Sequence, residues 1–140
     1  MNIRNYDPVT DYDAILILYR DGKTFGGQYD DARDTAEKLQ NLSDKNSEKI
    51  LVAEHEWKIF GTVTLFEDGR SAWLYRFAVK EDIDWWIVKA LHDHAVKILK
   101  SWWHTQVLVY APHGNKVFEE RYISIWMKKW WDYSCFWQDL

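Results

Sequence analysis

The chain has 140 residues, with 18 basic and 22 acidic side chains and a formal net charge of −4. A hydrophobic share of 47% excludes a disordered chain, and 29% charged residues exclude a chain built of membrane spans. The acidic balance argues against a general nucleic-acid or anionic-membrane surface. The unusual feature is aromatic, because Trp 10, Tyr 8 and Phe 6 together make up 17% of the residues.

The first part of the chain predicts one short strand and two helices. The alternation of Met1–Tyr6 is typical of a strand, and apolar side chains from Pro8 to about Arg20 recur with helical spacing. Glycines at 22, 26 and 27 predict a loop. Asp31–Asn46 then predicts a polar helix with a thin apolar face.

The middle of the chain predicts an antiparallel meander. Three runs rich in β-branched and aromatic residues follow one another, at Lys49–Glu56, Lys58–Phe66 and Ser71–Lys80. Only short polar turns separate them, which is the spacing of hairpins rather than of crossover connections.

The last part predicts a long helix over Asp84–Trp103, a strand over Thr105–Tyr110, a helix over Asn115–Ile125 and one or two strands within Lys128–Gln138. The full order is β-α-α-β-β-β-α-β-α-β. No linker or compositional break divides it, so we expect a single domain over residues 1–140. The expected class is α/β (α+β), with a mixed, mostly antiparallel sheet and helices on both faces.

Several stretches resemble the GNAT superfamily of acyl-CoA-dependent N-acyltransferases. ILVAEHEWKIFGTVTLFEDG is similar to the second and third strands of that family, and SAWLYRFAV is similar to its fourth strand. VLVYAPHGN and the following FEERYISI resemble its fifth strand and the next helix. The stretches occur in the family's order over nearly the whole chain. The resemblance implies the GNAT fold and transfer of an acetyl group from acetyl-CoA to an amine.

The resemblance also implies where acetyl-CoA binds. The family's fourth strand holds the acyl carbonyl by backbone amides, which here belong to Phe77, Ala78 and Val79. The pyrophosphate lies at the start of the next helix, where backbone N–H groups favour an anion. Asn115 matches an asparagine of the family, and capping of its own helix is the alternative role.

Two catalytic groups are implied by the same resemblance. Tyr122 matches the tyrosine that returns a proton to the leaving thiolate. A carboxylate removes a proton from the substrate amine, and Glu81 is our candidate. Glu54, Glu67 and Asp82 remain open for this role, because the sequence does not choose among them.

The predicted cofactor loop departs from the family pattern. The family places glycines there, which let the backbone approach the pyrophosphate closely. This chain has EDIDWWIVKAL at positions 81–91, with no glycine and no arginine. The indoles of Trp85 and Trp86 stand where the phosphates would lie, and the carboxylates of Asp82 and Asp84 would repel them. The departure predicts impaired binding of acetyl-CoA.

Other tryptophans stand at predicted helix ends and turns, where small or polar residues are usual. They are Trp103, Trp126, Trp130 and Trp131, whereas Trp57, Trp73, Trp102 and Trp137 have ordinary positions. Helical geometry places Trp85, Trp86 and Trp103 away from the core-facing stripe of their helix.

Surfaces dominated by Trp are typical of interaction hot spots. We therefore hypothesise a GNAT scaffold, engineered or specialised, whose Trp-rich surface binds a protein partner or a second copy of the chain. A functional N-acetyltransferase is the alternative.

The remaining features concern compartment and metal binding. Cys135 is the only cysteine, so no internal disulfide forms, which suits a reducing compartment. The N-terminus shows no apolar segment of signal-peptide length. The histidines lack the spacing of metal ligands. These features predict a cytoplasmic protein without a bound metal and without a nucleic-acid or membrane partner.

Overall fold

The computed structural model describes the chain except for residues 22, 26–28, 133, 137 and 139. The predicted glycine loop at 22, 26 and 27 and the ordinary position predicted for Trp137 lie outside the described residues. Two compact units are distinguished, Met1–Tyr110 and Ala111–Leu140. The single domain over residues 1–140 stays a prediction.

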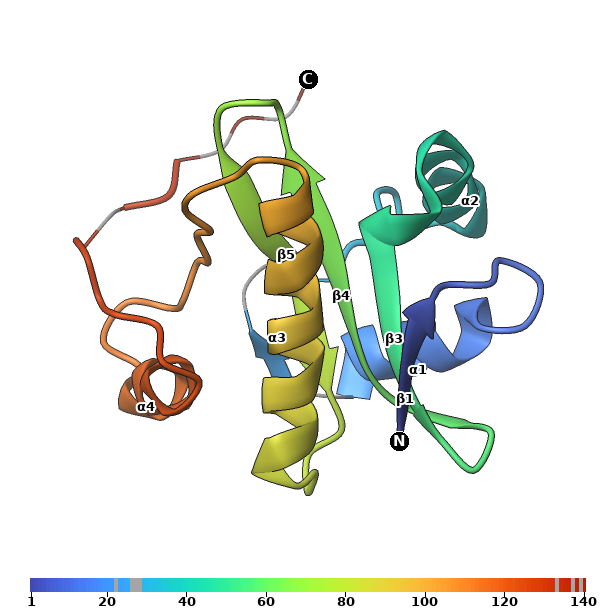
Figure 1. Cartoon of the computed structure of the whole chain (residues 1–140), viewed down its shortest axis with the longest axis horizontal. Coiled ribbons are helices and arrows are strands. Elements are labelled where there is room, and N and C mark those ends of the chain that lie inside the picture. Colours follow the sequence, from blue (N-terminus) through green and yellow to red (C-terminus); the bar gives the residue numbers. More distant parts are fainter. Residues whose placement is uncertain (22, 26–28, 133, 137, 139) are drawn as a thin grey trace. The chain divides into compact units, whose positions relative to one another are not determined.

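The first unit is built on a five-stranded sheet in which neighbouring strands are antiparallel (Figure 1). Its strands are β1 (Asn2–Asn5), β2 (Lys23–Phe25), β3 (Ile50–His55), β4 (Lys58–Glu67) and β5 (Ala72–Val79). Their order across the sheet is β1-β3-β4-β5-β2. The predicted meander is therefore the centre of the sheet, and β1 and β2 are added at its two edges.

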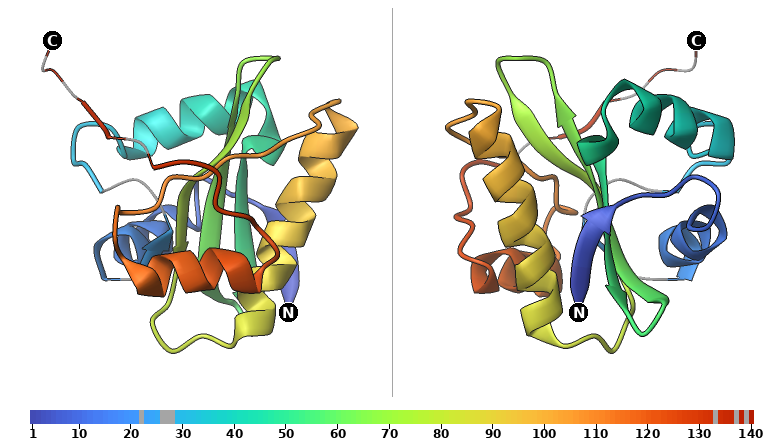
Figure 2. Two further views of the ribbon diagram at one scale, coloured as in Figure 1. Left: turned by 90° about the vertical axis from the view of Figure 1, so that its left-hand side faces the viewer. Right: turned by 45° about the vertical axis from the view of Figure 1, so that its right-hand side comes forward.

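Helices cover both faces of this sheet (Figure 2). α1 (Tyr12–Asp21) and α2 (Ala36–Lys45) lie on one face, and α3 (Trp85–Ser101) lies on the other. A short 3-10 helix, η1 (Ser47–Lys49), leads into β3, and the second unit contains α4 (Lys116–Ser124). The predicted class is confirmed. None of the helices in the described part of the chain has the length and apolar character needed to cross a membrane.

Burial on both faces explains why the helices pack there. On the α1 side, Ile15 and Leu18 are buried in one cluster with Ile50 of β3. On the α3 side, Leu91 is fully buried, and its Cδ2 would lie 3.3 Å from a Cβ added at Gly61. The missing side chain at position 61 therefore lets α3 approach β4 closely.

The structure differs from the predicted elements mainly at the edges of the sheet. Thr105–Tyr110 forms a single parallel bridge, between Leu108 and Trp73, in place of a strand. The described residues of 128–138 contain no strand, and β2 adds a strand that the sequence does not predict. A β-branched run becomes a strand only where a neighbour pairs with it, and that neighbour is set by tertiary structure.

Candidate active site

A bulge interrupts β5 beside the predicted cofactor-binding residues. Thr62 pairs with Ala78 but Thr64 pairs with Tyr75, so two residues of β5 face one residue of β4. One of the two, Arg76, has a φ of 49°, in the left-handed region that bulky side chains rarely adopt. A bulge of this kind bends the strand and redirects the residues that follow it.

Phe77 is the second residue of the bulge, and Ala78 and Val79 follow it. All three are buried, with exposed fractions of 0%, 0% and 2%. Just beyond them, the backbone N–H of Lys80 donates to the carbonyl of Phe60 in β4, at 2.9 Å. Successive N–H groups of a strand point to opposite edges. The N–H groups of Phe77 and Val79 therefore point away from β4.

The edge that faces away from β4 is paired with β2. Phe25 lies opposite Phe77, and Lys23 lies opposite Val79. The backbone that the family resemblance assigns to the acyl carbonyl is thus paired with a strand of the same chain. The sequence gives no sign of this pairing, because a three-residue strand is too short to show alternation.

The first half of β5 has a different neighbour. The N–H of Leu74 donates to the carbonyl of Leu108 at 2.9 Å, and the N–H of Leu108 donates to the carbonyl of Ala72 at 2.9 Å. The rings of Trp73 and Tyr110 stack with their centroids 4.7 Å apart. Within the described residues, no other bridge joins this segment to β5. The partner of β5 therefore changes at the bulge, from the Leu108 segment to β2.

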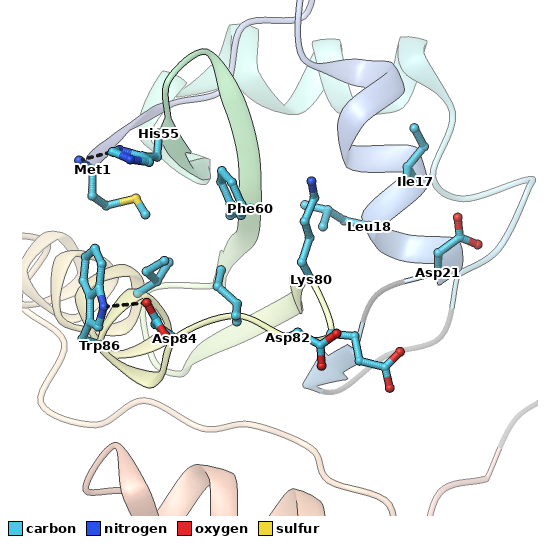
Figure 3. Close-up of a pocket in the computed structure, with 13 residues that line it drawn as sticks. Met1, Ile17, Leu18, Asp21, His55, Phe60, Lys80, Asp82, Asp84 and Trp86 are labelled. Carbon is cyan, nitrogen blue, oxygen red and sulfur yellow. Dashed lines mark hydrogen bonds between the residues drawn. The ribbon is translucent and has the colours of Figure 1, made fainter.

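A cavity of about 600 Å³ lies where β5 ends and α3 begins (Figure 3). The loop at positions 80–84 contributes most of its polar side chains, and Met1 with residues of α1, the β3–β4 hairpin and the start of α3 completes the lining. The Nζ of Lys80 lies 4.7 Å from the ring centroid of Phe60. The lining residues are Met1, Ile17, Leu18, Asp21, His55, Phe60, Lys80, Glu81, Asp82, Ile83, Asp84, Trp86 and Ile87.

The structure separates the four carboxylates that the sequence leaves open as a base. Glu81 and Asp82 line the cavity. Glu54 is in an ion pair with Arg4, with Nη2 and Oε2 2.5 Å apart. A hydrogen bond from a lysine of η1 holds the pKa of Glu67 below its usual value, which makes Glu67 a poor base. Among the described residues, no group of three His, Cys, Asp or Glu side chains is placed to hold a metal ion.

α3 begins without a side-chain cap. Asp84 occupies the N-cap position, but its side chain accepts no hydrogen bond from the backbone of the helix. One of its carboxylate oxygens accepts a bond from the indole Nε1 of Trp86, at 3.2 Å. Trp85 and Trp86 are half exposed, at 50% and 49%, so their predicted exposure is confirmed.

Three tryptophans hold left-handed backbone conformations in turns. Trp57, Trp103 and Trp126 have φ angles of 64°, 68° and 71°. Their exposed fractions are 93%, 92% and 77%. Trp103 follows α3 and Trp126 follows α4, at positions where helices commonly place glycine. The unusual placement predicted for these two is confirmed, and Trp57 shares it although the sequence does not single it out.

The second unit holds the remaining predicted site residues on and around α4. The Oδ1 of Asn115 accepts a hydrogen bond from the N–H of Phe118 at 3.3 Å, so Asn115 caps the helix. Tyr122 is buried, and its burial raises the pKa of the phenol far above the usual value. The phenol therefore stays protonated at neutral pH. Trp130 and Trp131 are exposed and lie outside helices and strands.

Comparison with known proteins finds matches in structure and none in sequence. No protein-family model matches the chain, and no curated protein sequence matches it. The PaiA N-acetyltransferase of Thermoplasma acidophilum, in complex with coenzyme A, is similar with a TM-score of 0.71 and 24% identity, over 87% of this chain and 86% of that one. The apo aminoglycoside 6'-N-acetyltransferase AAC(6')-IG of Acinetobacter haemolyticus is similar with a TM-score of 0.76 and 13% identity, over 100% and 99%.

A third similar structure also contains the cofactor. It is a protein of Mycobacterium tuberculosis in complex with CoA, with a TM-score of 0.65 and 19% identity, over 87% of this chain and 70% of that one. At these identities the likeness concerns the fold. The chain has the GNAT acetyltransferase fold that its sequence predicts.

Proposed function

We propose that the protein is an acetyl-CoA-dependent N-acetyltransferase. The observation that carries this proposal is the change of neighbour along β5, at a bulge, within a fold shared with N-acetyltransferases. The segment around Leu108 pairs with β5 through one bridge only. The edge of the second half of β5 is therefore taken by a different neighbour. β2 takes that edge in this structure, and we propose that an extended acyl-pantetheine chain takes the place of β2 when acetyl-CoA binds.

The residues fit acetyl-CoA at two points and oppose it at one. The N–H groups of Phe77 and Val79 on the β2 edge are donors for a bound carbonyl once β2 has left. The 17-residue α3 starts without a side-chain cap, the arrangement in which helix N-termini accept phosphate. Asp82 and Asp84 next to that terminus oppose an anion, so we expect weaker binding than a glycine-rich loop would give.

Bound acetyl-CoA would supply an activated acetyl group as a thioester. In the protein, Glu81 is proposed to accept the proton of the acceptor amine, because it lines the cavity. Tyr122 is proposed as the proton donor, because it matches the tyrosine with this role in the family, and its raised pKa restricts donation to a strongly basic group such as the leaving thiolate. Asp21, Asp82 and Asp84 add negative charge to the cavity lining, which favours an amine that arrives as a cation.

Acetyl-CoA is expected to stabilise the protein against unfolding. At a concentration a hundredfold above the dissociation constant, binding adds about 2.7 kcal/mol to the free energy of unfolding, which raises Tm by several degrees. The measurement is Tm against acetyl-CoA, with ATP at equal concentration as a polyanion control, followed by thiol release from acetyl-CoA with a panel of primary amines. No Tm shift at millimolar acetyl-CoA together with no amine-dependent thiol release would overturn the proposal.

A second candidate function, binding of a protein partner or a second copy, is favoured by the strained and exposed tryptophans. A tryptophan in a left-handed turn costs about 1–2 kcal/mol relative to an ordinary conformation. The surface proposed for binding has a part in each unit, with Trp85, Trp86 and Trp103 in the first and Trp126, Trp130 and Trp131 in the second. Among these, Trp103 and Trp126 carry this cost and keep their rings exposed, which points to a use for those rings, whether engineered or natural.

A glycine substitution at position 103 tests whether the exposed indole of Trp103 takes part in binding or only strains the backbone. Trp103→Gly is expected to raise the free energy of unfolding by about 1 kcal/mol, because the left-handed turn no longer carries a side chain. Trp57→Gly is the matched control, since Trp57 has the same conformation and exposure but lies outside the proposed surface. Sedimentation velocity should show self-association that Trp103→Gly weakens and Trp57→Gly does not. A wild-type monomer at every concentration would exclude the second copy as the partner.

A further inference from the structure

We propose that Asp34 is a positioning residue for acetyl transfer, acting through a buried ion pair with Arg76 that fixes the bulge of β5. The bulge sets the direction of the Phe77 and Val79 backbone N–H groups. The inference rests on the proposed function, because it is the acyl carbonyl that these groups would hold.

The ion pair is double and almost fully buried. The Nε of Arg76 donates to Oδ1 of Asp34 at 3.0 Å, and Nη2 lies 2.8 Å from Oδ2. The two side chains are 3% and 5% exposed. Removing two charges from water is costly, and well-packed apolar residues in place of a buried ion pair often give a protein equal stability. A buried pair at this place therefore indicates a requirement for geometry.

The ion pair holds the backbone of Arg76 in an unusual conformation. Its φ of 49° is strained for a residue with a long side chain, and such strain persists only where surrounding contacts impose it. The guanidinium also lies 4.8 Å from the ring centroid of Tyr75. The contacts of one buried guanidinium thus fix the residue at which β5 turns away from regular pairing with β4.

Asp34 is itself held by several elements. Its Oδ2 accepts a hydrogen bond from the N–H of Asp30 at 2.9 Å, and its own N–H donates to the carbonyl of Asp30 at 2.9 Å. The hydroxyl of Tyr12 in α1 donates to the carbonyl of Asp34 at 3.1 Å. Thr35, the next residue, caps α2. The carboxylate is therefore anchored to α1 and α2. The position of these two helices determines where the carboxylate holds Arg76 of β5.

The test compares Asp34→Asn with a neighbour in the same turn. Asp34→Asn keeps the shape of the side chain but leaves the buried guanidinium without its counter-charge. We expect KM for acetyl-CoA to rise about tenfold and kcat to fall, with shifted ¹⁵N–¹H signals for Phe77 and Val79. Asp30→Asn is the control, because the Asp30 carboxylate pairs with exposed Arg33 and not with Arg76, and an amide oxygen can still accept from the backbone N–H groups of Ala32 and Arg33. We expect it to leave kcat, KM and both amide signals unchanged.

If Asp34→Asn does not fold, the double variant Asp34→Leu with Arg76→Met removes both charges together and keeps the inference testable. Wild-type kcat, KM and amide signals in a folded variant of either kind would overturn the inference. Equal changes in Asp30→Asn would also overturn it, because a general effect on the turn would then explain them. Failure of the wild-type protein to bind acetyl-CoA would overturn the proposed function and the positioning role in acetyl transfer, whereas the two amide signals would still show whether Asp34 fixes the bulge.

Discussion

Tyr122→Phe is expected to lower kcat for acetyl transfer by about 10²- to 10⁴-fold, the contribution typical of a general acid. The substitution removes only the phenol oxygen from a buried ring. Burial raises the pKa of the phenol above the usual value for tyrosine, so the hydroxyl carries its proton at neutral pH and gives it up only to a strongly basic acceptor. The measurement is kcat at saturating acetyl-CoA and amine, with Tm recorded to show that the variant is folded.

The control is a second buried tyrosine. Tyr6 is 4% exposed, and its hydroxyl has no hydrogen-bond partner among the described residues. Burial raises its pKa to about 12, so Tyr6 is, like Tyr122, a buried tyrosine with a raised pKa, but it does not lie on α4. Tyr6→Phe should leave kcat within a factor of two, roughly the scatter of a neutral substitution. An equal loss in both variants, or none in Tyr122→Phe, would contradict a role as proton donor.

The centre of the fold could be predicted from the sequence, and its edges could not. Three β-branched runs with short turns between them leave little choice but a meander, and β3, β4 and β5 lie within a residue or two of the predicted bounds. β2 is too short to show a period, and the segment around Leu108 has strand composition but only one bridge. Whether each of these two segments forms a strand depends on the segment that pairs with it. A single sequence does not show which segments pair.

The candidate site shows the same limit. The run Ser71–Lys80 predicts a strand that contains Phe77–Val79, and this strand is β5; helical geometry predicts the exposure of Trp85 and Trp86. The choice among the four carboxylates needed tertiary contacts, because Arg4, which pairs with Glu54, lies 50 residues away from it. Asp34 could not be found from the sequence at all, since its partner on β5 is 42 residues away. Charged residues in a polar segment look like solvated surface until their partners are known.

Each proline in β2 is expected to tighten the binding of acetyl-CoA about fivefold. The pairing of β2 with Phe77 and Val79 occupies the N–H groups that the proposed function assigns to the acyl carbonyl. When only a fraction of molecules has the edge open, the apparent dissociation constant is the intrinsic one divided by that fraction. Proline at position 23 removes a backbone donor that faces β5, and each such hydrogen bond contributes about 1 kcal/mol. Weakening β2 therefore raises the open fraction.

Calorimetric titration with acetyl-CoA measures this effect in Lys23→Pro and in the double variant Lys23→Pro with Phe25→Pro. Thr24→Ala is the matched control, because it changes the same strand and keeps every backbone donor. The double variant should bind more tightly than the single one, since it loses a second donor. If both proline variants bind acetyl-CoA as the wild type does, the cofactor does not use this edge, and the acyl carbonyl must be held elsewhere. If they bind more weakly, β2 supports the site and does not compete with the cofactor.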